Sequence, residues 1–211
     1  MLPGWGERDG LPEIFRILRQ GAGLATFQRV LLADPACVIE RRGSHNDTPL
    51  LACVRDNKRP DVVRLLLEHG AHVWDTDREG RGALCISLTA ADSMLWPTVE
   101  EEARRYEVCG LLQKAGAELN LRSASGCTTA DEVLCLTGKP CVAFYPERWL
   151  PVIDMRLQWC LAHGGEVSRS ILRAPAAAAV LERLDLRRQA LRVAKQSGWK
   201  DFIMTHVIDY F

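Results

Sequence analysis

The 211-residue chain lacks an excess of either charge, because 27 Lys and Arg residues face 27 Asp and Glu residues. Proteins that bind nucleic acid in general need a basic excess to displace the counterions around phosphates. The chain also lacks the low hydrophobicity of a disordered protein, since 47% of its residues are hydrophobic. We therefore expect a folded protein that does not bind nucleic acid.

Long hydrophobic runs are missing as well. The longest aliphatic stretch, residues 176–181, is far shorter than the roughly 20 residues that span a bilayer. Residues 1–9 carry acids and no apolar core, which argues against a signal or transit peptide. We expect no membrane association and a cytoplasmic location, with the nucleus and the cytoskeleton or cilium as alternatives.

Motifs for phosphate binding, acyl transfer and metal binding are also absent. The sequence has no Gly-x-Gly-x-x-Gly or Walker loop and no Gly-x-Ser-x-Gly turn. Its eight cysteines form no Cys-x-x-Cys pair, and most lie in apolar runs, so we interpret them as reduced core residues. His69 and His72 flank an expected turn and need not converge on an ion. We expect no enzymatic activity, no cofactor and no metal.

What the sequence contains is a recurring pattern of apolar residues, a small residue and glycine. The pattern is clear at residues 62–71, 108–117 and 157–165 and degenerate at 27–36. Apolar residues at i, i+3 and i+4 give a helix a buried stripe, and the glycine ends that helix in a left-handed conformation. Ahead of the first clear copy, Thr48 and Pro49 suit the N-cap and first position of another helix. The pattern predicts a series of helix pairs.

A turn, a Thr48-Pro49-Leu50 helix start, a second helix and Gly70-Ala71 together resemble the ankyrin repeat, whose period is about 33 residues. The resemblance implies an all-α solenoid of stacked helix pairs joined by short hairpin loops. We predict a single domain over residues 1–211 with about five repeats. Their expected ranges are 10–42, 43–76, 77–122, 123–166 and 170–211, the last being a cap with a basic outer face.

Two of the intervals between helix-ending glycines are longer than the period. Gly70, Gly116 and Gly164 leave about 13 and 15 extra residues, which we place within 89–105 and 137–151. Insertions in repeats map to loops on one face, often the binding face. We predict that Trp96, Tyr145 and Trp149 in these insertions contact a partner. The alternative is that the inserted aromatics pack on the solenoid's own helices.

The charge run at residues 100–105 contains acids followed by arginines. We interpret it as the solvated first turn of a helix, where acids are favoured by the helix dipole. A docking patch for a partner is the alternative.

The resemblance implies a non-catalytic protein–protein interaction module or scaffold, monomeric when free. Its protein partner would dock on the hairpin tips and on the concave face of the first helices. Trp74 and Arg78 are the strongest candidates, because Trp and Arg are enriched at interface hot spots. The matching positions are Arg42, His45, Asn46, Trp74, Asp77, Arg78 and Arg122 on the hairpins, and Arg55, Asp56 and Asn57 on a first helix.

Two other roles fit the same fold: a structural subunit of a large assembly, such as a ciliary or ribosomal complex, and a substrate adaptor for a ubiquitin ligase. Ankyrin adaptors carry a box motif after the repeats, whereas this sequence ends within the expected fifth repeat. We therefore favour the interaction module over the adaptor.

A separate pattern involves Leu112, Glu118, Leu119 and Asn120, whose spacing resembles the asparagine-hydroxylation motif of ankyrin repeats. The alternative is that Asn120 is a turn asparagine, chosen for its tolerance of left-handed φ.

Overall fold

The structure is a computed structural model that describes residues 12–57, 59–90, 97–136, 146–168 and 182. The chain divides into two compact units, residues 1–92 with 97–125 and residues 93–96 with 126–211, and each is treated by itself below. The described residues form helices and two isolated β-bridges but no strand, which confirms the all-α prediction. In this part of the chain, no helix is both long and apolar enough to cross a bilayer.

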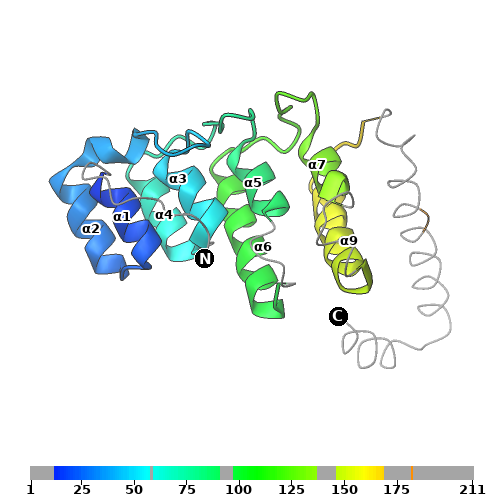
Figure 1. Ribbon diagram of the computed structural model, residues 1–211, viewed down its shortest axis with the longest axis horizontal. Coiled ribbons are helices and arrows are strands. Elements are labelled where there is room, and N and C mark those ends of the chain that lie inside the picture. Colours follow the sequence, from blue (N-terminus) through cyan, green and yellow to red (C-terminus); the bar gives the residue numbers. More distant parts are fainter. Residues whose placement is uncertain (1–11, 58, 91–96, 137–145, 169–181, 183–211) are drawn as a thin grey trace. The chain divides into compact units, whose positions relative to one another are not determined.

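The helices of the first unit stand side by side, and the loops between successive pairs emerge along one edge (Figure 1). In chain order the helices are α1 (Glu13–Gln20), α2 (Leu24–Ala33), η1 (Pro35–Ile39), α3 (Pro49–Ala52), η2 (Cys53–Asn57), α4 (Pro60–Glu68), α5 (Ala83–Thr89) and α6 (Val99–Lys114). α1 packs on α2, α3 on α4 and α5 on α6. These contacts are the predicted helix pairs.

The predicted helix signals act as expected. Thr48 caps α3 by accepting a hydrogen bond from the Leu51 amide, and Pro49 occupies the first position of the helix. After α4, Gly70 adopts a φ of 87°, and the Ala71 amide donates to the Leu66 carbonyl. This left-handed ending satisfies carbonyls that the helix would otherwise leave unpaired. The same arrangement follows α6, where the Gly116 φ is 94°.

The core lies between paired helices and consists of aliphatic side chains and thiols. Leu50, Leu51 and Leu66 are fully buried where α3 meets α4, and Leu112 is fully buried on α6. The cysteines that are buried are Cys37, Cys53, Cys85, Cys109 and Cys160, whereas Cys127 is half-buried and Cys135 exposed. The interpretation of most cysteines as reduced core residues is consistent with this burial.

Much of the first insertion is helix rather than loop. α6 has 16 residues against 9 in α4, and the difference adds about two turns at its start. Thr98 begins α6 with a capping box shared with Glu101. Part of the predicted solvated turn is wrong, because Glu102 and Arg105 are buried: Arg105 Nε donates to Glu102 Oε1 at 2.9 Å, and Arg105 Nη1 donates to the Ser87 carbonyl. The charges pair with each other instead of facing water.

The second unit contains α7 (Thr129–Cys135) packed against α9 (Pro146–Ala162). Thr128 and Asp131 form a capping box at the start of α7, and Asp131 also accepts the Ser168 amide at 2.7 Å. Burial raises the pKa of Asp131, but hydrogen bonds from Ser168 and Thr128 lower it by more than burial raises it. The pKa of Asp131 therefore lies below its ordinary value. Residues 146–151 of the second predicted insertion are helical. Residues 170–211, the expected fifth repeat, lie outside the described residues except for Glu182.

Candidate protein-interaction edge

The loops of the first unit form a continuous edge, which we call the hairpin edge and define as residues 41–47, 72–82 and 117–125. The first loop closes through a bridge in which Arg42 and Asp47 exchange backbone hydrogen bonds of 2.8 and 2.9 Å. The second loop closes through a bridge between Thr76 and Gly82. Gly43 supplies the left-handed conformation that the first turn needs, with a φ of 79°.

Successive hairpins are joined by backbone hydrogen bonds at their tips. The Arg78 amide donates to the His45 carbonyl at 2.7 Å, and the Ala124 amide donates to the Glu79 carbonyl at 2.8 Å. Gly80 allows the second contact, because a Cβ there would lie 2.9 Å from the Ala124 nitrogen. The tips are therefore held in one spacing.

A buried ionic cluster, here called the Asp77 cluster, lies beneath these tips and consists of Asp47, Arg55, Asp77 and Arg81. Arg55 binds Asp47 through two bonds of 2.9 Å and Asp77 through one of 2.8 Å. Arg81 binds the same oxygen of Asp77 at 2.8 and 3.0 Å. The other oxygen accepts the amides of Glu79 and Arg81, both at 2.9 Å. Arg55 thus links two successive hairpins.

Asp77 is charged in this setting despite a side chain that is 0% exposed. Burial raises the pKa of Asp77, but the hydrogen bonds from Arg81 and Arg55 lower it by more than burial raises it. The pKa therefore lies below its ordinary 3.8. Burial likewise lowers the pKa of Arg55, while its bonds to Asp47 and Asp77 raise it above its ordinary value. Ion pairing keeps both side chains charged at neutral pH.

A groove of about 210 Å³ opens beside the second hairpin. The indole of Trp74 lies at this groove with 67% of its surface exposed, and its Nε1 donates to the Gly116 carbonyl at 3.1 Å. Glu118 is the single charged residue of the lining. We call this feature the Trp74 groove and define it by its lining residues Val73, Trp74, Gly82, Ala83, Leu84, Ala117, Glu118 and Leu121.

The sequence profile of the ankyrin repeat matches residues 45–78, which run from one hairpin tip through α3, η2 and α4 to the next tip. The match begins at His45 and ends at Arg78, the two residues joined by the first tip-to-tip hydrogen bond. Residues 45–78 are therefore an ankyrin repeat. No curated protein matches it. Ankyrin repeats are in general protein–protein interaction modules, and domains built from them are typically non-catalytic.

Six of the thirteen predicted partner-binding residues lie exposed on the hairpin edge. They are Arg42, His45, Asn46, Trp74, Arg78 and Arg122. Asn120, the candidate for hydroxylation, is also exposed there. Asn46 adopts a φ of 57°, a conformation that asparagine tolerates better than most residues.

Other predicted residues have different surroundings. Asp77 is buried in the Asp77 cluster, and Arg55 donates its hydrogen bonds to Asp47 and Asp77 within that cluster. Neither side chain is therefore available to contact a partner. Trp149 is 1% exposed within the second unit, as the packing alternative for the inserted aromatics anticipates. The side chains of Asp56 and Asn57, and all of Trp96 and Tyr145, lie outside the described residues.

Four residues that organise the edge were missed from the sequence: Arg41, Asp47, Asp75 and Arg81. Asp47 directly precedes Thr48, the N-cap of α3, whereas Asp77 lies five residues before Gly82, the N-cap of α5. The two acids therefore occupy different positions of the repeat, and only spatial contacts bring both to Arg55. Arg41 Nη2 binds Asp75 Oδ1 at 2.6 Å and Arg41 Nη1 donates to the Thr76 carbonyl at 2.8 Å, contacts that no local pattern indicates.

Proposed function

We propose that this ankyrin-repeat protein is a non-catalytic interaction module whose hairpin edge binds an acidic segment of a partner protein. The observation that carries the proposal is the pair of exposed arginines, Arg42 and Arg78, on neighbouring hairpins. Neither guanidinium has an ion pair among the described residues. The backbone bond from Arg78 to His45 fixes the spacing of the two tips before any partner binds.

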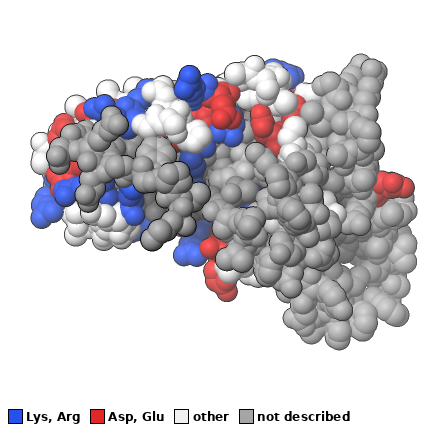
Figure 2. Space-filling model, in the orientation of Figure 1, with Lys and Arg blue, Asp and Glu red and all other residues white. Residues whose placement is uncertain are grey.

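The acids of the first two hairpins are already engaged within the module. Asp47 and Asp77 belong to the Asp77 cluster, and Asp75 is bound by Arg41. Glu79 remains largely exposed but lies 3.2 Å from Arg81. Basic and acidic side chains accordingly lie next to one another along the upper edge in Figure 2. The positive charge left for a partner is that of Arg42 and Arg78.

Arginine suits this role because its planar guanidinium binds a carboxylate through two parallel hydrogen bonds. Rigid presentation matters too, since a preorganised surface loses little conformational freedom on binding. A partner segment rich in Asp or Glu therefore fits the edge better than a neutral or basic one.

The test compares the full chain with R42A/R78A in affinity purification with quantitative mass spectrometry. The matched control is R19A/R29A, which removes two exposed arginines from α1 and α2. We expect partners retained by the wild type and the control to fall about ten-fold or more on R42A/R78A. Cross-linking should place the retained contact on an acidic segment of the partner.

Two outcomes would contradict the proposal. Equal retention by R42A/R78A would exclude the hairpin tips as the binding surface. Failure of the wild type to retain any protein under mild conditions would contradict the interaction module itself. Weakening of the contact at higher salt is expected, because exposed charges are screened over about 10 Å at 0.1 M ionic strength.

A further inference from the structure

We propose that the Trp74 groove binds one apolar side chain of a partner segment in which a basic residue stands next to it. The inference rests on the proposed function, since it names the chemistry of a second part of the partner. The hairpin tips select acidic residues, whereas the groove selects an apolar residue with a neighbouring positive charge.

The indole of Trp74 is fixed in place although it is exposed. Its Nε1 donates to the Gly116 carbonyl at 3.1 Å, and its Cζ2 lies 3.9 Å from where a Cβ on Gly116 would be. The ring edge is thus held against the turn after α6, while Trp74 as a residue remains 67% exposed. A fixed indole offers a large apolar contact at little entropic cost, which is why tryptophan dominates many interface hot spots.

Other exposed apolar side chains do not share this setting. Leu32, Ile39 and Val99 are also large and exposed among the described residues, but none of them lines the Trp74 groove. Single exposed apolar residues are normal on protein surfaces. An exposed indole that lines a groove together with Val73, Leu84 and Leu121 is a shaped apolar site.

The size of the groove decides what kind of group it takes. Its volume is about 210 Å³, below the roughly 300–1,000 Å³ typical of sites for drug-sized ligands and cofactors. A single leucine, methionine or isoleucine side chain is a better match than a cofactor. Moving such a side chain from water onto the apolar lining would be favourable in free energy.

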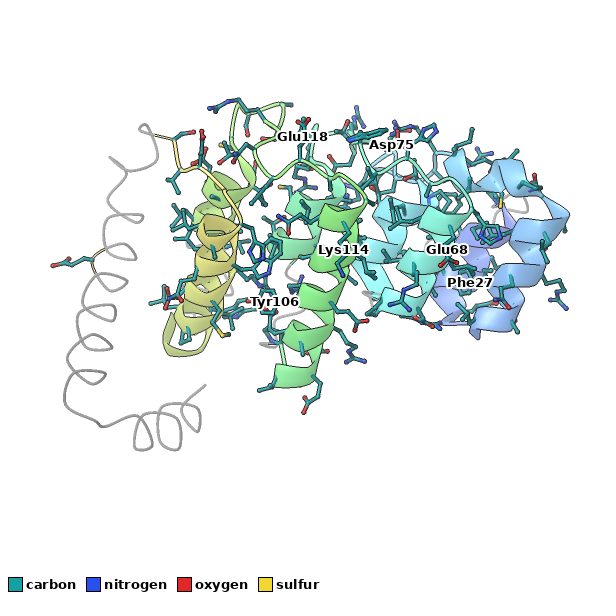
Figure 3. All side chains as sticks on the ribbon, turned by 180° about the vertical axis from the view of Figure 1, so that it is seen from behind. Phe27, Glu68, Asp75, Tyr106, Lys114 and Glu118 are labelled. Atoms are coloured by element: carbon teal, nitrogen blue, oxygen red, sulfur yellow. The ribbon has the colours of Figure 1, made fainter. Side chains whose placement is uncertain are left out.

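The carboxylate at the groove favours a basic residue next to the apolar side chain of the partner. Glu118 is exposed, lines the groove and has no ion pair among the described residues. Figure 3 shows Glu118 and Asp75 at the loop edge, with Lys114 and Glu68 on α6 and α4. Asp75 is already bound by Arg41, so Glu118 is the carboxylate at the groove that is free to attract a cation. A lysine or arginine beside the apolar residue complements it.

The test uses NMR and three capped tripeptides: acetyl-Lys-Leu-Lys-amide, acetyl-Glu-Leu-Glu-amide and acetyl-Lys-Ser-Lys-amide. The probe is the indole Nε1–H resonance of Trp74 in the full chain, assigned by its loss in W74F. We expect Lys-Leu-Lys to shift this resonance saturably at millimolar concentration and Lys-Ser-Lys to leave it unchanged. Glu-Leu-Glu should bind about two- to five-fold more weakly, the range expected for one exposed charge pair.

Two variants separate the apolar contact from the charge. A117L fills the groove while keeping Trp74, and should abolish the Lys-Leu-Lys shift with the spectrum otherwise preserved. E118Q should bring Lys-Leu-Lys and Glu-Leu-Glu to within about two-fold of each other. Equal binding of Lys-Ser-Lys, equal binding of Glu-Leu-Glu to the wild type, or unchanged binding by A117L would each overturn the proposal.

The same protein samples distinguish this inference from the proposed function. R42A/R78A should bind Lys-Leu-Lys as the wild type does, because those arginines do not line the groove. If Lys-Leu-Lys fails to bind while R42A/R78A still loses its partners, only the groove assignment falls. If the wild type retains no partner, the proposed function falls whatever the tripeptides do.

Discussion

Replacing Asp77 with alanine should destabilise the first unit by about 3 kcal/mol. The substitution removes a carboxylate that is 0% exposed and accepts five hydrogen bonds, two from backbone amides and three from Arg55 and Arg81. Both arginines stay mostly buried, with side chains 18% and 17% exposed. Breaking a buried ion pair by removing one partner typically costs about 3–5 kcal/mol, and the partial exposure of the arginines argues for the lower end.

The matched control is Asp75→Ala on the same hairpin. Asp75 forms one short ion pair with Arg41, whose side chain is 35% exposed, and such pairs contribute about 0–1 kcal/mol. Urea unfolding followed by circular dichroism compares the two variants, and hydrogen exchange of the Glu79 and Arg81 amides reports the loss locally. A loss below about 1 kcal/mol for D77A, or an equal loss for D75A, would refute the assignment of Asp77 as the centre of the cluster.

The same residue gives a pH dependence whose sign follows from its pKa. The pKa of Asp77 is lower in the folded protein than its ordinary 3.8, so the unfolded chain binds the proton more readily. Its stabilising contribution is complete above the ordinary value and is lost as the pH falls below 3.8. Wild type should therefore lose stability more steeply than D77N between about pH 5 and pH 2. Parallel curves would contradict the ionised state of Asp77.

Three further substitutions or labels test the fold. At Gly80 the φ is 72°, and the Cβ of an alanine would lie 2.9 Å from a backbone atom. Gly80→Ala should therefore lower the free energy of unfolding by at least about 1 kcal/mol more than Gly43→Ala, whose Cβ would meet open space. Equal urea midpoints for the two variants would contradict the close approach. Leu66→Ala removes a fully buried side chain and should cost about 2–5 kcal/mol, whereas Leu32→Ala, 74% exposed, should change stability by less than about 0.5 kcal/mol. Burial, and then neighbouring carboxylates, raise the pKa of the Cys37 thiol to about 11, so iodoacetamide at pH 8 should label it far more slowly in the folded protein than in urea, as read by peptide mass spectrometry.

The helix pairs were predictable because their signals are local. Thr48 and Pro49 start α3, and Gly70 ends the turn after α4, through contacts within a few residues. The longer α6 was predictable in principle, since Thr98 and Glu101 have the spacing of a capping box. The charge run at residues 100–105 was accordingly interpreted as the first turn of a helix, although the predicted insertion at 89–105 includes the same residues.

The site was less predictable, because its geometry depends on contacts distant in sequence. A charged residue in a loop ordinarily faces water, but the buried Asp77 is bound by Arg55, which lies 22 residues earlier in the sequence. Trp149 is likewise 1% exposed on α9, a helix that packs against α7. The exposure of Arg42 and Trp74 was anticipated, but the groove was not, since it requires two turns that are 42 residues apart.

The tip-to-tip hydrogen bonds have a consequence for how this surface can change. Both run from a main-chain amide to a main-chain carbonyl, at Arg78 to His45 and at Ala124 to Glu79. Neither bond uses the side chain of the residues it joins, so those side chains can be exchanged while the pitch of the hairpins is retained. A combinatorial library at His45, Arg78 and Glu79, with Gly80 and the Asp77 cluster kept constant, would alter recognition without altering the frame that displays it.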